Sequence, residues 1–98
     1  MSINTFNINF TPVGSETVEI DQISTGLGAV PIGAFSALVY VEGSDIRFWT
    51  SGSDPTSTEG FKVNADEYFS MGSIDQINAF RVVSLTSTNA RLQIQYYK

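Results

Sequence analysis

The chain has 98 residues, of which 42% are hydrophobic and 15% charged, and its formal net charge is −5. A chain of this length suits one domain, so we expect residues 1–98 to form a single folded unit around one core. The sequence contains no cysteine and no histidine. This excludes zinc sites of the usual Cys/His kind and catalytic centres that use histidine as the general base. Because Lys and Arg are few and scattered, no nucleic-acid partner is expected either.

Targeting signals are also missing from the sequence. The first ten residues, MSINTFNINF, have neither a basic start nor the apolar run of a secretory signal peptide. No stretch approaches the roughly 20 apolar residues that a membrane-spanning helix needs. We therefore expect a soluble protein without a membrane partner.

Alternation of apolar and polar residues runs through most of the chain and predicts strands with one buried face. In the last of them, Leu92 and Ile94 alternate with Gln93 and Gln95. The segment 36–42, SALVYVE, is apolar on both faces and is predicted to be a central strand. The predicted strands are 5–10, 17–21, 36–42, 45–50, 61–63, 67–71, 79–85 and 90–97.

Turn signals separate these strands. Gly43-Ser44 predicts a two-residue hairpin, and residues 64–66 predict a second one. Residues 86–90 predict a third tight turn, with Asn89 in a left-handed conformation. The segment 22–35 is rich in glycine and is interpreted as a long crossover between two sheets. A single helical turn is expected at 73–79, capped by Ser73.

These elements predict an all-β fold, an antiparallel β-sandwich with jelly-roll or Greek-key-like topology and seven to eight short strands. No helical pattern of 10–15 residues appears, which argues against α/β architectures. The predicted core residues are Phe6, Ile8, Val39, Val41, Ile46, Phe48, Phe80, Val82, Leu92 and Ile94.

Carboxylate pairs are the first enzymatic signal to consider, since glycosidases use two of them roughly 5–10 Å apart. Asp54 with Glu59, and Asp66 with Glu67, are the available pairs. Asp54 precedes Pro55 and is expected to initiate a turn by accepting backbone N–H bonds. Residues 65–67 lie at a predicted turn, where carboxylates are solvated. We expect no enzymatic activity and no catalytic residues.

Calcium requires several converging oxygen ligands. Asp45, Asp54 and Glu59 lack the alternating spacing of a calcium-binding loop. The glycine-rich segment 24–33 lacks the lysine and the following helix of a phosphate-binding loop. No metal and no cofactor are expected.

Aromatic residues and arginines on polar strand faces leave several interpretations open. Trp49, Tyr40 and Tyr97 are predicted to point outward, where aromatic side chains either pack, fill a protein interface or form a stacking surface for sugars. Arg47 and Arg81 also lie on polar faces. Together with Arg91 they either pair with acids across strands, such as Glu19 or Glu42, or meet a partner's carboxylates.

The segment 48–61, FWTSGSDPTSTEGF, is the longest polar connection after a predicted strand. Between Trp49 and Phe61 it contains only Ser, Thr, Gly, Asp, Glu and Pro, so we do not expect it to contribute to the core. Long loops in small domains are usually functional. A catalytic loop, a ligand-binding loop and a docking surface are the three possibilities.

Residues 37–97 resemble a family of small proteins of tailed-bacteriophage virions. In that family a strand ending in VEG leads to IR and an aromatic residue, then to DPT between two glycines, an I..FR segment and a final YY. The first 36 residues match only in a weaker TPVG start. The matching residues are Val41-Glu42-Gly43, Ile46-Arg47-Phe48, Gly52, Asp54-Pro55-Thr56, Gly60, Ile77, Phe80-Arg81 and Tyr96-Tyr97.

The resemblance implies a virion component made in the host cytoplasm, a capsid decoration or cement protein that binds the major capsid protein or other virion proteins. It also implies a homo-oligomer, for example a trimer, and it brings no catalytic residues. The alternative is a tail-associated module that binds the host surface or a carbohydrate. The residues expected at a protein interface are Arg47, Trp49, Asp54, Pro55, Thr56, Glu59, Arg81 and Tyr97.

Overall fold

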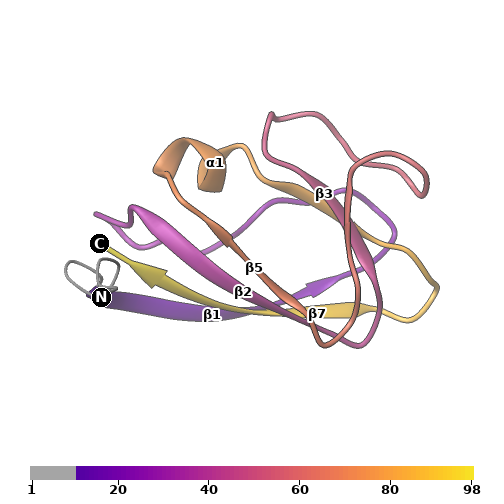
Figure 1. The fold of residues 1–98 in the computed structure, drawn as a ribbon, viewed down its shortest axis with the longest axis horizontal. Helices are drawn as coiled ribbons and strands as arrows, with labels where there is room; N and C mark the ends of the chain where they lie inside the picture. Colours follow the sequence, from indigo (N-terminus) through magenta and orange to yellow (C-terminus); the bar gives the residue numbers. More distant parts are fainter. Residues whose placement is uncertain (1–10) are drawn as a thin grey trace, which may run out of the picture.

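A computed structural model describes residues 11–98 of the chain (Figure 1). The predicted strand 5–10 and the predicted core residues Phe6 and Ile8 lie outside the described residues. The rest of the chain forms seven antiparallel strands in two sheets and one short helix. The prediction of an antiparallel β-sandwich is therefore confirmed.

The two sheets have four and three strands. β7 lies between β1 and β2, so the first two strands of the four-stranded sheet are separated by the last, a Greek-key-like connection. The four-stranded sheet contains, in spatial order, β1 (Pro12–Ile20), β7 (Ala90–Tyr97), β2 (Ser36–Glu42) and β5 (Tyr68–Met71). The three-stranded sheet contains β4 (Phe61–Val63), β3 (Ile46–Trp49) and β6 (Arg81–Ser84).

The alternation in the sequence determines which face of each strand is buried. In β7 every second residue is buried, from Ala90 to Tyr96, and the residues between them are exposed. Leu92 pairs with Val18 on one side and with Val41 on the other, so three strands contribute to the core at one level. β2 is a central strand as predicted, but only one of its faces is buried, and Leu38 on the other face is 38% exposed.

The predicted core is confirmed for the described residues. Phe48 is half-buried, and its ring stacks on Phe69 of the other sheet with centroids 4.4 Å apart. Phe80 is fully buried, and the centroid of its ring lies 5.5 Å from that of Phe48. The other predicted core residues that are buried are Val39, Val41, Ile46, Val82, Leu92 and Ile94.

The three short turns do not form hairpins, and this prediction is wrong. Gly43-Ser44 leads from β2 in one sheet to β3 in the other, and the turns at 64–66 and 85–89 also connect the two sheets. Gly43 has a φ of +85°, and among residues 11–98 the non-glycine residue with a positive φ is Asp66, not Asn89. A turn sequence specifies where the chain reverses, but the neighbour of each strand is determined by how both sheets cover the core.

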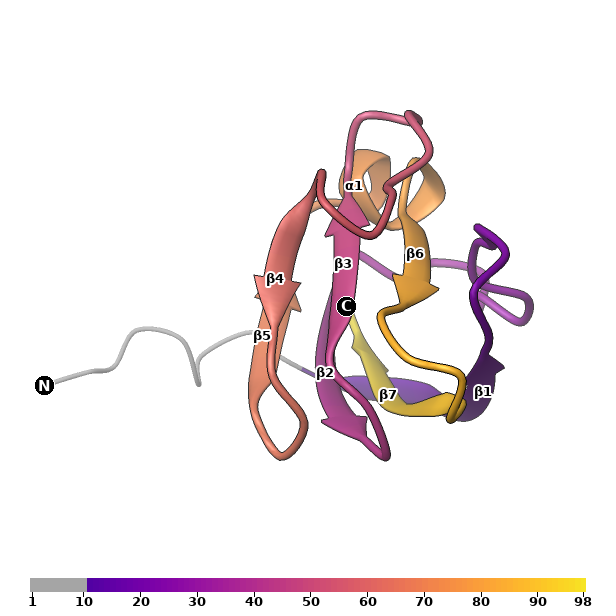
Figure 2. The same ribbon diagram turned by 90° about the vertical axis from the view of Figure 1, so that its right-hand side faces the viewer.

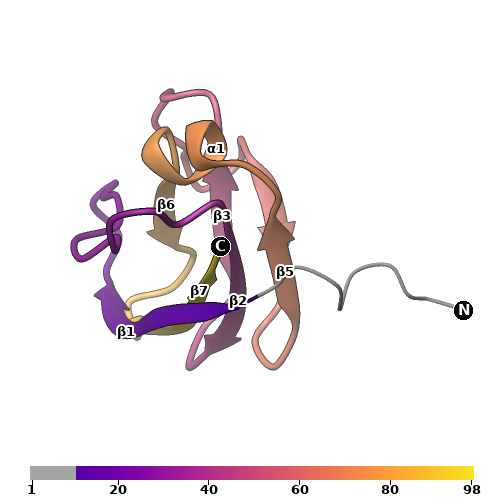
Figure 3. The same cartoon turned by 90° about the vertical axis from the view of Figure 1, so that its left-hand side faces the viewer.

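The crossover at 22–35 begins and ends in the four-stranded sheet, and not in different sheets as predicted. On its way it passes the edge of the three-stranded sheet (Figure 3), where Thr25 and Val82 exchange two backbone hydrogen bonds of 3.1 and 2.9 Å. The segment therefore closes one side of the sandwich.

The predicted helical turn is confirmed as α1 (Ile74–Asn78). Ser73 is its N-cap, and the Ser73 hydroxyl accepts a hydrogen bond of 3.2 Å from the backbone N–H of Gln76. Ile77 is buried in the core and Ile74 packs against it. The helix closes the same end of the sandwich at which the long polar loop emerges (Figure 2).

Candidate functional site

The polar loop at 50–60 connects β3 to β4, and these two strands pair with each other in the three-stranded sheet. Among the described strands, it is the one connection that joins direct neighbours in a sheet. The loop is fixed to the helical end of the molecule, because the N–H of Gly52 donates a 3.0 Å hydrogen bond to the carbonyl oxygen of Ala79. The loop is therefore tied to the sandwich close to the point where it leaves β3.

Arg47 holds the returning half of this loop. It lies on the outer side of β3, because its neighbours Ile46 and Phe48 point inward. Its Nη1 donates a 2.8 Å hydrogen bond to the carbonyl oxygen of Gly60, and its Nε donates a 3.3 Å bond to that of Ser57. The guanidinium thus satisfies backbone acceptors of the loop with a fork of donors.

Arg81 holds the first half of the loop through Asp54. The Nε atom of Arg81 lies 3.2 Å from Oδ1 of Asp54, and the hydroxyl of Ser24 donates a 2.8 Å hydrogen bond to the same oxygen. Arg81 also donates to the carbonyl oxygen of Ser24 at 3.1 Å. The Ser24 hydrogen bond, followed by Arg81, lowers the pKa of the Asp54 carboxyl. Loop, crossover and β6 are joined at this point.

Within the loop, Thr56 performs the turn-forming role predicted for Asp54. Its hydroxyl oxygen accepts hydrogen bonds from the N–H groups of Thr58 and Glu59, at 3.2 and 3.0 Å. Pro55 is buried, but neither it nor any other residue of the loop belongs to the hydrophobic core, so the expectation that the loop does not contribute to the core is confirmed. A Cβ on Gly60 would lie 3.1 Å from the Cβ of Pro55 and 3.2 Å from that of Arg47, so the loop packs closely on β3.

The outward side of the loop is polar and exposed. Trp49 lies beside it and makes an edge-on contact with Phe61, with ring centroids 5.3 Å apart. The indole borders an open groove of about 570 Å³. The groove is lined by Trp49, Ser51, Ser53, Asp54, Glu59 and Gly60.

The structure brings together seven of the eight predicted interface residues, all in or beside the 50–60 loop. Tyr97 is the exception, because it lies on β7 in the other sheet, where its hydroxyl accepts a 3.0 Å hydrogen bond from Gln95. Trp49, Tyr40 and Tyr97 therefore do not form the stacking surface considered from the sequence. Ser24, which completes the Asp54 contact, was not predicted, because only the path of the crossover brings it to the loop.

Both carboxylates of the Asp66–Glu67 pair have structural partners. Asp66 accepts a 3.1 Å hydrogen bond from the Tyr40 hydroxyl, and Glu67 accepts a 3.0 Å bond from the backbone N–H of Asn64. Asp45 accepts a 2.8 Å bond from the N–H of Ala65. In the part of the chain that the structure describes, no three acidic side chains are grouped as ligands for a metal ion.

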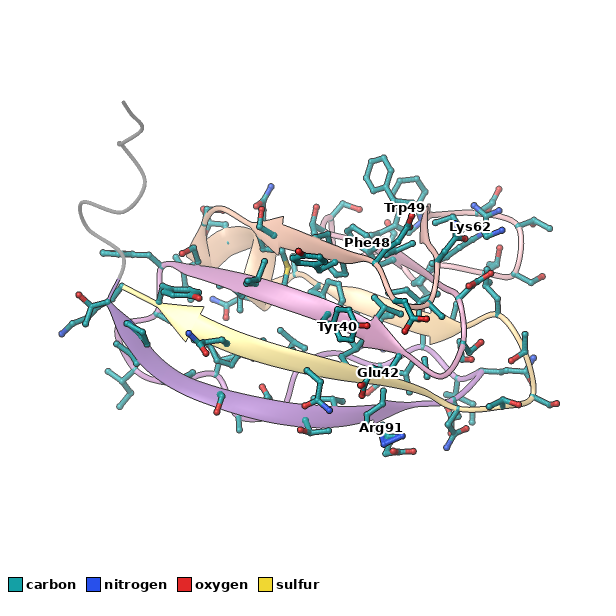
Figure 4. All side chains as sticks on the ribbon, turned by 60° about the horizontal axis from the view of Figure 1, so that its bottom comes forward. Tyr40, Glu42, Phe48, Trp49, Lys62 and Arg91 are labelled. Atoms are coloured by element: carbon teal, nitrogen blue, oxygen red, sulfur yellow. The ribbon has the colours of Figure 1, made fainter. Side chains whose placement is uncertain are left out.

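Arg91 pairs across strands, one of the two roles considered for it. It lies opposite Glu19 of β1 and Glu42 of β2, and its Nε is 3.7 and 3.8 Å from their carboxylate oxygens (Figure 4). This three-residue cluster crosses the outer side of the four-stranded sheet at one end.

Comparisons with protein-family models, with curated proteins and with solved structures found no match to this chain. Within residues 11–98, no helix is long and apolar enough to cross a membrane.

Proposed function

We propose that this protein is a non-enzymatic structural component of a bacteriophage virion, a capsid decoration or cement protein that binds and stabilises the major capsid shell. The resemblance of residues 37–97 to virion proteins supports the proposal that the protein is part of a virion. The way in which the 50–60 loop is held supports the docking role, and it is the observation that carries the proposal. The major capsid protein or another virion protein is the partner.

The loop is suited to docking because its shape is set before a partner arrives. Arg47, Arg81 and the buried Pro55 hold its backbone, and the hydroxyl of Thr56 closes its tip. A loop that is already ordered loses less conformational entropy on binding than a mobile one. Most of its exposed side chains, such as those of Ser53 and Ser57, have no charge, so they meet a polar neighbour without the desolvation of ions; Asp54 and Glu59 are the two charged residues of the loop.

The test separates the contact surface from the anchors. Ser53→Arg with Ser57→Arg adds two bulky cations to the outward side of the loop and leaves Arg47, Asp54 and Pro55 in place. The control is Ser87→Arg with Thr88→Arg in the β6–β7 turn, at the opposite end of the three-stranded sheet (Figure 2). Both variants are expected to fold like the wild type, as judged by circular dichroism and melting temperature.

Particles assembled with the loop variant are expected to carry little of the protein, and particles assembled with the control are expected to carry the wild-type amount. Quantitative mass spectrometry of purified particles measures both. Equal incorporation of the two variants would refute docking through this loop. Absence of the wild-type protein from purified particles would refute the virion role altogether.

The alternative, a tail-associated module that binds the host surface, predicts few copies on each particle and a loss of adsorption to cells when its binding surface is changed. A decoration protein is instead present in amounts comparable to the shell protein and affects particle stability. Copy number and adsorption assays on the same particles therefore distinguish the two functions.

A further inference from the structure

The outer side of the four-stranded sheet has a character that differs from that of the 50–60 loop. Strand pairing places Thr17, Gln93, Tyr40 and Tyr68 in one row across β1, β7, β2 and β5. A second, parallel row lies two residues further along the strands. It consists of Ser15, Gln95, Leu38 and Ser70.

These two rows form an open groove of about 680 Å³. A row across four strands spans three inter-strand spacings of about 4.8 Å each, roughly 14 Å in all. This is long enough for a short linear oligomer and too open for a small buried cofactor. The lining residues are Ser15, Glu16, Thr17, Leu38, Tyr40, Tyr68, Gln93, Ile94 and Gln95.

The polar side chains of the groove are fixed in orientation. Gln93 lies at its centre, where its Oε1 accepts a 2.6 Å hydrogen bond from the hydroxyl of Thr17 and its Nε2 donates a 3.0 Å bond to Glu42. An amide nitrogen has two donors, so the Gln93 side chain, which lines the groove, has a second N–H that can bond to a ligand. Gln95 likewise uses its nitrogen to donate to Tyr97, which orients the amide.

Two tyrosine rings form the wall on the other side. Tyr40 and Tyr68 meet edge to face with centroids 5.9 Å apart, and Tyr68 is 66% exposed. The hydroxyl of Tyr40 donates to Asp66, which fixes the position of its ring. A large part of an aromatic ring is thus available beside amides and hydroxyls.

The charges around the groove indicate which ligand it suits. Eight of its nine lining residues are uncharged, and the ninth, Glu16, belongs to the inward-facing set because it pairs with the buried Ile94. At one end Glu42 and Glu19 flank Arg91, and their net charge is negative. The whole chain also has a net charge of −5. The negative potential around the groove therefore repels phosphates, sulfates and acidic sugars.

We propose that this groove binds a neutral oligosaccharide. The C–H face of a sugar ring packs on an aromatic ring, and its hydroxyls bond to oriented amides and hydroxyls, which are the groups that the groove presents. Tyr68 provides the stacking ring and Gln93 and Gln95 the hydrogen bonds. The site lies on a different sheet from the 50–60 loop (Figure 4), so it goes beyond the proposed docking role and does not depend on it.

The test uses the full chain and a defined set of probes. Maltohexaose, cellohexaose, mannohexaose and hexa-N-acetylchitohexaose are titrated separately at up to millimolar concentration, with heparin as an anionic comparison. Binding is followed by isothermal titration calorimetry and by amide chemical shifts. We expect at least one neutral probe to bind with shifts confined to β1, β2, β5 and β7, and heparin not to bind there.

Tyr68→Ala is expected to weaken that binding by about tenfold or more, the usual loss for a stacked aromatic anchor. Phe61→Ala is the matched control, because Phe61 is also an exposed aromatic residue, 58% exposed, but belongs to the three-stranded sheet. Gln93→Leu removes the central hydrogen bonds at similar size and is expected to weaken binding as well. Both groove variants must keep the wild-type melting temperature within a few degrees.

Three results would overturn the proposal. One is the failure of all four neutral probes to bind. Another is equal loss of binding in Tyr68→Ala and Phe61→Ala. The third is a concentration-dependent dimer that Tyr68→Ala dissociates, since a second copy of the chain would then cover the groove. None of these results bears on particle incorporation through the loop, so the two proposals fail separately.

Discussion

Arg81 and Asp54 lie 27 residues apart in the sequence, yet their Nε and Oδ1 atoms are 3.2 Å apart in the structure. The contact fastens the 50–60 loop to β6, and Ser24 of the crossover donates to the same carboxylate oxygen. The shape of the loop therefore depends on an ionised side chain. This dependence makes the loop sensitive to acid.

The acid sensitivity can be predicted from the direction of the pKa shift. The hydrogen bond from Ser24 and the guanidinium of Arg81 lower the pKa of Asp54 in the folded protein below its ordinary value of 3.8. A carboxyl with a lowered folded pKa contributes stability above its unfolded pKa, and this contribution is lost as the pH falls through the folded value. We expect Asp54→Asn to be less stable than the wild type at neutral pH and equal to it in strong acid.

Urea denaturation at a series of pH values measures this difference. Because the Asp54 side chain is exposed, the effect at neutral pH is expected to be small. Glu59→Gln is the control, since Glu59 is an exposed acidic residue of the same loop, whereas the carboxylate that pairs with Arg81 is that of Asp54. A constant gap between wild type and Asp54→Asn down to the lowest pH would contradict the assigned cause.

Phe80 is expected to be among the residues on which stability depends most. It is 1% exposed, and its ring lies near those of Phe48 in one sheet and Phe69 in the other, with centroids 5.5 and 6.0 Å away. Truncation leaves a cavity between the sheets, so Phe80→Ala is expected to lower the free energy of unfolding by about 3–5 kcal/mol. Chemical denaturation measures this loss of unfolding free energy. An unchanged denaturation midpoint in Phe80→Ala would mean that the ring does not lie in the core.

The strand phases were predictable because alternation is a local property of the sequence. The burial of Leu92 and the exposure of Gln93 follow from it directly. The pairing of strands was not predictable in the same way. Gly43-Ser44 has the composition of a hairpin turn, but it joins two sheets, because β2 already pairs with β5 and β7.

The same limit applies to the sites. Arg47 and Trp49 were correctly predicted to point outward, since they alternate with Ile46 and Phe48. That Arg47 bonds to carbonyl oxygens of the loop depends on how the loop folds back. The meeting of Tyr40 with Tyr68 depends on the pairing of β2 with β5, which local patterns do not encode.

Two glycines with nearly equal positive φ values offer a matched pair of substitutions. Gly43 and Gly33 have φ values of +85° and +87°. A Cβ on Gly43 would lie 2.7 Å from the carbonyl oxygen of Asn89, whereas a Cβ on Gly33 would meet nothing within 4 Å. Gly33→Ala is expected to cost about 1 kcal/mol, the penalty for the left-handed conformation.

Gly43→Ala adds a clash with the backbone of Asn89 to that penalty. We therefore expect it to lower the stability clearly more than Gly33→Ala does. Melting temperatures of the two variants, measured side by side, give the comparison. Equal losses would show that the β2–β3 and β6–β7 turns do not approach each other as closely as the structure places them.

The buried hydroxyl of Tyr96 predicts the behaviour of the protein in alkali. Tyr96 has no exposed surface, and its hydroxyl donates a hydrogen bond to Glu16, which also accepts from the backbone N–H of Ala29 in the crossover. Burial, and then the hydrogen bond and charge of Glu16, raise the pKa of Tyr96 above its ordinary value of 10.0. A phenol that ionises less readily in the folded state contributes stability that is complete below its unfolded pKa.

That contribution is lost as the pH rises above about 10, because the unfolded chain then releases a proton that the folded chain retains. We expect the wild type to lose stability over this range and Tyr96→Phe to lose less, since phenylalanine fills the same space and has no proton. At neutral pH the variant is expected to be about 1–3 kcal/mol less stable, the cost of a lost hydrogen bond to a charged group.

Denaturation at pH values on both sides of 10 measures both effects of Tyr96→Phe. Tyr97→Phe, at the neighbouring position on the outer side of β7, is the control. Parallel pH profiles for the wild type and Tyr96→Phe would show that another group causes the alkaline loss.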